Sequence, residues 1–135
     1  MATGTVATVA HKHALDLVHY VTCPIVYTTL AYNVGVLPAG ALVVPSLSGV
    51  YVTTAFAGGT PQTLDIGIGS DPDDFATALV ITAKGYKVID EFATMDDAYM
   101  TADTTVTATL SAGATVSAGA GFVVIAYVMA NRSLG

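Results

Sequence analysis

Short runs of β-branched and aromatic residues, separated by glycine or proline, recur along most of the chain. The clearest run is Thr105 to Leu110, where threonines alternate with Val106, Ala108 and the closing leucine. Because successive side chains of a strand point to opposite faces, this alternation predicts a strand with one polar and one apolar face. Thr63 to Ile68 alternates in the same way, with Leu64, Ile66 and Ile68 on its apolar side.

Other segments predict strands from their composition: Val50 to Phe56, Leu79 to Thr82 and Tyr86 to Ile89. Ala41 to Val44 and Phe122 to Val128 are apolar without alternation, which is typical of strands buried on both faces. In a two-layer β-protein one of those faces meets the core. The other face then needs a partner, a loop or a helix to cover it.

With about eight or nine short strands and regular turn signals, the chain is predicted to be all-β, an antiparallel β-sandwich that could take the form of a jelly roll. One or two short helical turns are expected. Ser70 to Phe75 has the capping residue, proline and acids of a helix start, and Asp90 to Met100 has apolar residues at helical spacing. Ala83 to Gly85 is predicted to be a tight hairpin connection. We expect residues 1–19 to form an N-terminal arm and residues 20–135 a single domain.

Charged residues make up only 10% of the 135-residue chain, whereas an average soluble domain has roughly 25%. So few charges favour a surface that is partly covered by copies of the chain or by another protein. The alternative is a neutral surface rich in threonine and alanine. The net charge of −6 and the four scattered bases argue against direct binding of nucleic acid.

The segment between Asp16 and Asp65 contains no other acid, lysine or arginine, but it does not predict a membrane helix. Prolines and glycines interrupt it before about 20 apolar residues are reached. The first residues, Met1 to His13, lack the pattern of a signal peptide. The single cysteine, Cys23, can form no disulfide within the chain, which fits folding in a reducing cytoplasm.

Two groups of residues have the chemistry of metal ligands. His11 and His13 would share one face of a strand, with His19 nearby, but no further ligand stands at a convincing spacing. The acids of Asp71 to Asp74 are as dense as those of a calcium loop, but they lack its ligand order, and helix capping explains them more simply. We therefore expect neither a metal nor a cofactor.

No catalytic arrangement is recognisable, and an enzyme is not expected. Cys23 precedes a proline in an apolar stretch and is best explained as a small buried side chain. Gly67-Ile68-Gly69 lacks the third glycine and the helix of a dinucleotide loop. The adjacent acids Asp90/Glu91 and Asp96/Asp97 are typical of a solvated surface.

Tyrosines are suited to interfaces because each combines a large apolar ring with a polar tip. The alternative is that they line the core and rim of the sandwich. The candidate interface residues are His11, His13, Tyr20, Tyr27, Tyr32 and Tyr51.

Several stretches resemble small structural proteins of tailed bacteriophages. They are LPAGALVV from Leu37, VTTAFAGGT from Val52, LDIGIGSDPDDF from Leu64, VTATL from Val106, AGAG from Ala118 and FVVIAYV from Phe122. The resemblance lies in strands and turns, covers roughly residues 37–128, and is strongest to head decoration (cement) proteins.

The resemblance implies a non-enzymatic virion protein that binds the assembled head from outside and stabilises it. Its partners would be the major capsid protein and further copies of itself, with a trimer favoured, and it would be made in the host cytoplasm. The arm, Met1 to His19, is expected to reach the capsid or an adjacent subunit. The alternatives are a tail, neck or fibre-associated phage protein, or a carbohydrate-binding β-sandwich.

Overall fold

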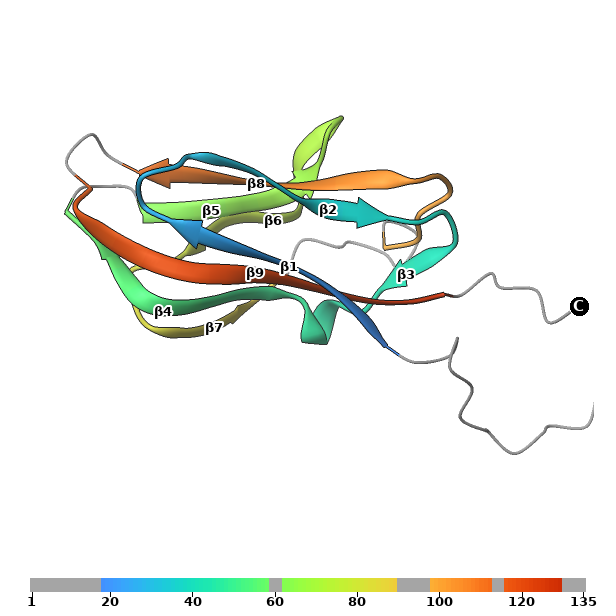
Figure 1. Ribbon diagram of the computed structural model, residues 1–135, viewed down its shortest axis with the longest axis horizontal. Helices are drawn as coiled ribbons and strands as arrows, with labels where there is room; N and C mark the ends of the chain where they lie inside the picture. The colour runs from blue at the N-terminus through green and yellow to red at the C-terminus, as the bar shows by residue number, and fades with distance from the viewer. Residues whose placement is uncertain (1–17, 59–61, 90–97, 113–115, 130–135) are drawn as a thin grey trace, which may run out of the picture.

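The first and last described strands of the chain, β1 and β9, pair with each other over the whole length of β1 (Figure 1). The computed structural model describes residues 18–58, 62–89, 98–112 and 116–129. Within these residues the strands are β1 (His19–Val26), β2 (Ala31–Leu37), β3 (Ala41–Val43), β4 (Gly49–Ala57), β5 (Gln62–Ile68), β6 (Asp71–Val80), β7 (Gly85–Val88), β8 (Thr104–Ala112) and β9 (Ala118–Met129).

The strands form two layers (Figure 1). Sheet A has the order β1-β9-β4-β7, with the short β3 also paired to β9, and sheet B has the order β2-β8-β5-β6. All of the pairings are antiparallel. Early strands therefore lie beside late ones, and the chain crosses repeatedly between the sheets. This is the double Greek-key order of a jelly roll, with β3 as an addition. The predicted antiparallel β-sandwich is confirmed, and it takes the jelly-roll form.

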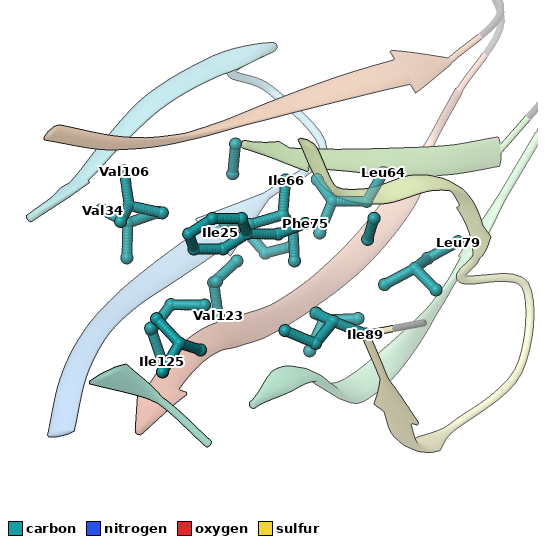
Figure 2. Packing of buried hydrophobic residues seen from close by; sticks show 14 of the residues in the cluster. Ile25, Val34, Leu64, Ile66, Phe75, Leu79, Ile89, Val106, Val123 and Ile125 are labelled. Atoms are coloured by element: carbon teal, nitrogen blue, oxygen red, sulfur yellow. The ribbon is translucent and has the colours of Figure 1, made fainter. Parts of the chain in front are cut away.

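The core lies between the two sheets. Figure 2 shows Phe75 of β6 between the layers, among side chains from both sheets. Phe75, Leu64 and Ile125 are completely buried. Burying each such side chain contributes about 1.5–3 kcal/mol, so contacts between the sheets dominate the stability of the fold.

The alternating patterns of the sequence correspond to real strands. On β8 the side chains of Val106, Ala108 and Leu110 are buried, and the threonines between them are partly or fully exposed. On β5 Leu64 and Ile66 are buried in the same way. The predicted inner faces of both strands are confirmed.

The helix predicted at Ser70 to Phe75 is wrong. The chain turns at Gly69 and Ser70 and continues directly as β6, which pairs with β5. Extended backbone places Phe75 and Leu79 in the core, and the gain from pairing and burial outweighs the local capping signals. Residues 90–97 of the second predicted helix lie outside the described residues. Residue Tyr99 near its end forms a β-bridge with Leu42 rather than a helical turn.

The predicted hairpin at Ala83 to Gly85 is also wrong, because these residues connect β6 of sheet B to β7 of sheet A. The one helical element among the described residues is a 3-10 turn, Pro45–Leu47, which begins with proline. The buried Ser48 follows this turn, and its Oγ accepts a hydrogen bond of 2.9 Å from the amide of Ala126 on β9. The turn is thereby tied to sheet A.

The prediction that Phe122 to Val128 is buried on both faces holds at one end only. Val123, Ile125 and Ala126 are completely buried, but 41% of Phe122 is exposed. The outer side of β9 is therefore closed near Ser48 and open near Phe122.

Candidate interaction surface

A row of four large side chains crosses the outer face of sheet A. Pro24 of β1 pairs with Phe122 of β9, which pairs with Tyr51 of β4, which in turn pairs with Tyr86 of β7. Directly paired residues of neighbouring strands lie on the same face. The rings of Tyr51 and Phe122 are stacked, with centroids 5.9 Å apart and an angle of 14° between their planes. The pairing register therefore gathers residues from four separate parts of the sequence into one strip.

Tyr20 of β1 belongs to the same face. It lies four residues before Pro24 on β1 and therefore points to the same side of the sheet. Burial raises the pKa of Tyr86, and repulsion by the ionised Tyr20 adds to the rise. We call this surface the aromatic face and define it by Tyr20, Tyr51, Tyr86 and Phe122.

No charged side chain occupies the outward positions around these rings in the described strands of sheet A. The next row runs through Thr22, Val124, Gly49 and Val88. Lys87 pairs with the buried Val50, so it lies on the opposite side of β7 from the tyrosine. The surface therefore offers ring edges, methyl groups and a few hydroxyls.

Two glycines allow the strands of this sheet to approach closely. A Cβ at Gly121 would lie 2.4 Å from the carbonyl oxygen of Tyr51, and one at Gly49 would lie 2.0 Å from that of Lys87. Larger residues would push β9 from β4 and β4 from β7. The close approach of these strands accompanies the pairing of Phe122 with Tyr51 and of Tyr51 with Tyr86.

The aromatic face is large enough to serve as a contact surface. Its four rings expose between 40% and 56% of their surface. At about 150–250 Å² for each aromatic side chain, they present roughly 270–450 Å² to solvent. Apolar patches larger than a few hundred Å² on soluble proteins commonly mark interaction sites.

Tyr20 and Tyr51, two of the residues that the sequence singles out for an interface, lie on the aromatic face. The other two tyrosines pack against the core. The hydroxyl of Tyr32 accepts a hydrogen bond of 2.9 Å from the Val26 amide and donates one of 2.7 Å to its carbonyl oxygen, fastening the connection between β1 and β2. Tyr27 is partly buried. His11 and His13 lie outside the described residues.

Phe122 and Tyr86 were not among the sequence candidates. Phe122 opens an unbroken apolar run, and Tyr86 belongs to a short strand with no special pattern. Their importance comes from the register that places them beside Tyr51. The sequence signal that could have pointed to Phe122 is the apolar run itself, because the outer face of such a strand needs a cover.

The outer face of sheet B is different. Its outward positions on β8 are Thr105, Thr107 and Thr109, and Asp65 of β5 pairs with the last of them. The Asp65 carboxylate accepts a hydrogen bond of 2.7 Å from the amide of Ala78. We call this surface the threonine face. A shallow hollow of about 320 Å³ lies on it beside Tyr32, Asn33, Ile68 and Pro72.

The titratable groups of the described residues do not assemble into a reactive site. They contain no group of three or more His, Cys, Asp or Glu side chains able to hold a metal. His19 stacks on Tyr127 with ring centroids 5.4 Å apart. Burial raises the pKa of the Cys23 thiol, which disfavours the reactive thiolate. No helix in the described part of the chain has the length and apolar character needed to cross a membrane.

The fold is shared with chains from two bacteriophage capsid structures. A chain of the cyanophage Pam1 capsid asymmetric unit superimposes with a TM-score of 0.66 and 16% sequence identity, over 93% of this chain and 94% of that one. A chain from the acid-stable capsid of Helicobacter pylori bacteriophage KHP30 gives a TM-score of 0.63 and 16% identity, over 84% and 89%. The fold is the shared property. Neither protein-family models nor curated protein sequences match the chain.

Because the coverage is high in both directions, the two matched chains have nearly the same length as this one. The likeness therefore extends over most of the length of both chains.

Proposed function

We propose that this chain is a non-enzymatic structural protein of a tailed-bacteriophage virion, and specifically a decoration (cement) protein on the outer surface of the head. The observation that carries the proposal is the near full-length likeness to chains of two phage capsid structures. A fold alone does not determine a function, so the surface has to suit the task as well. The aromatic face supports the proposal because it is an apolar surface suited to protein neighbours.

The partners in this proposal are the major capsid protein and further copies of the chain, with a trimer favoured. The protein would be made in the host cytoplasm and would join the head after the shell has assembled. A capsid repeats one binding site many times, so weak contacts to the shell become strong when bound copies also hold one another. The two-sheet core provides a rigid body for such contacts.

The N-terminal arm, Met1 to His19, is the proposed link to the shell or to an adjacent subunit. Strand β1 begins at His19, at the edge of sheet A, so the preceding residues are joined directly to the sheet that bears the aromatic face. A polar segment of this kind gains order by docking.

A tail, neck or fibre position in the virion is the alternative within the same class of protein. A carbohydrate-binding sandwich is the alternative from another class, and the aromatic face supplies the rings on which a sugar could stack. However, the rows through Tyr51 and Val88 contain no amide, carboxylate or basic side chain to orient sugar hydroxyls. That composition suits a protein neighbour better.

The deciding experiment is co-sedimentation of the purified chain with phage heads that lack it, followed by cryo-electron microscopy of the pelleted particles. We expect saturable binding and regular density on the outer head surface. A variant without residues 1–13 should remain folded and lose occupancy of the head. Density only at the tail or neck would support the first alternative, and binding to glycans without binding to heads would support the second.

A further inference from the structure

The aromatic face is the exposed apolar surface that a partner in solution would cover first. Its four rings come from β1, β4, β7 and β9 and are each at least 40% exposed. A second copy of the chain is present from the time of synthesis.

Charge decides which surface two copies can share. The chain carries a net charge of −6, so most contacts between copies bring acids together. In the described residues every acid lies away from the aromatic face: Asp65 is on β5, Asp71, Asp73 and Asp74 are on β6, and Asp103 directly precedes β8. Sheet B carries Asp65 on β5 and three further acids on β6, so a contact between copies through the threonine face meets repulsion between like charges.

We propose that a second copy of this chain packs on the aromatic face, with the stacked Tyr51 and Phe122 at the centre of the contact. These two residues lie on β4 and β9, the two inner strands of the row β1-β9-β4-β7. Central aromatic side chains surrounded by small apolar and hydroxyl groups match the usual anatomy of an interface hot spot. The inference deepens the proposed function, because it assigns a surface to the contact between copies suggested there.

The test compares two substitutions that add the same charge to opposite faces. Tyr51→Glu places a carboxylate at the centre of the aromatic face, and Thr105→Glu places one on the threonine face of an equally central strand. Circular dichroism and thermal unfolding check that each variant folds, and sedimentation velocity over a wide concentration range gives the mass. Phe122→Ser serves as a second variant should Tyr51→Glu fail to fold.

We expect the wild type and Thr105→Glu to form a dimer or trimer. Tyr51→Glu should weaken self-association by about thirtyfold or more, because an unpaired buried carboxylate opposes the contact. A wild type that stays monomeric would overturn the inference, and so would a Tyr51→Glu variant that associates as strongly as Thr105→Glu.

The same proteins incubated with heads separate this inference from the proposed function. A wild-type oligomer that ignores heads supports the self-contact and contradicts the decoration role. A wild-type monomer that binds heads, with binding lost in Tyr51→Glu, supports the decoration role and overturns the self-contact, since the face then belongs to the shell.

Discussion

The two outer faces of this sandwich are built from the same number of principal strands but carry opposite chemistry. Sheet A presents Tyr20, Tyr51, Tyr86 and Phe122, whereas sheet B presents threonines, Asp65 and two exposed valines, Val36 and Val80, and no aromatic side chain of its described strands is among the large exposed ones. Both sheets bury apolar side chains inward, so the contrast is not a requirement of the core. The inner residues of each strand are constrained by packing in the core. The outer residues are constrained by contact with solvent or with a neighbouring protein.

The largest expected change in stability comes from a substitution on the inner face of β9, compared with one on its outer face. Ile125 is completely buried, so Ile125→Ala should lower the free energy of unfolding by about 2–5 kcal/mol. Phe122→Ala, on the outer side, should cost less in dilute solution, and its cost should grow with protein concentration as the proposed self-contact forms. Urea unfolding at several concentrations measures both, and equal, concentration-independent losses would contradict the division between the faces.

A smaller loss of stability is expected from a substitution at Gly121, where β9 and β4 approach each other closely. Gly121→Ala should cost about 1–3 kcal/mol, because its Cβ would collide with backbone atoms of β4. The matched control is Gly69→Ala, whose Cβ would meet nothing within 4 Å. Thermal unfolding of the two variants gives the comparison. A control that loses as much stability as Gly121→Ala would show that close strand approach is not the cause.

The stacked pair on the aromatic face should show a modest coupling. A double-mutant cycle with Tyr51→Ala and Phe122→Ala is expected to give about 0.5–1.5 kcal/mol, the range of aromatic pairs in contact. It is measured by urea unfolding at low protein concentration, where self-association is weakest. A coupling near zero would mean that the contact between the two rings does not stabilise the folded monomer.

The smallest expected effect is that of Asp71, on β6 of sheet B, whose contribution to the stability of the fold depends on pH. A hydrogen bond with the Asp73 side chain raises the pKa of Asp71 above its ordinary value of 3.8, and desolvation and repulsion by Asp73 add to the rise. The folded state therefore holds this proton more tightly than the unfolded state does. The resulting stabilisation is present below the ordinary pKa and is lost as the pH rises through the raised one.

Asp71→Asn removes this titration, so the variant should gain slightly in melting temperature relative to wild type at neutral pH. The gain should shrink as the pH falls through the raised pKa and disappear below 3.8, where wild-type Asp71 becomes protonated in both states. Melting curves of both proteins between neutral and acidic pH provide the test. A difference that stays constant across that range would show that the carboxyl does not titrate as described.

Local patterns in the sequence were sufficient to predict the strands but not their arrangement. The alternation of Thr105 to Leu110 predicted the inner face of β8 correctly, since period-two burial is a local property. The acids and proline after Ser70 predicted a helix wrongly, because pairing with β5 and burial of Phe75 are non-local.

The same distinction explains the candidate surface. Tyr20 and Tyr51 were found from residue type, but Phe122 and Tyr86 join them only through the registers of β9 and β7 with β4. A register between strands far apart in sequence leaves no mark in a short window. The possible roles of His11 and His13 remain predictions from the sequence.

The position of β9 has a consequence for the order of events during synthesis. It is the last described strand, yet it lies between β1 and β4 and also pairs with β3. Until β9 has left the ribosome, β1, β3 and β4 lack the strand with which all three pair, and sheet A cannot form. Phe122 lies on that same strand, so the aromatic face is complete only once β9 has joined sheet A. We therefore expect a growing chain to lack the proposed contact surface until β9 is in place.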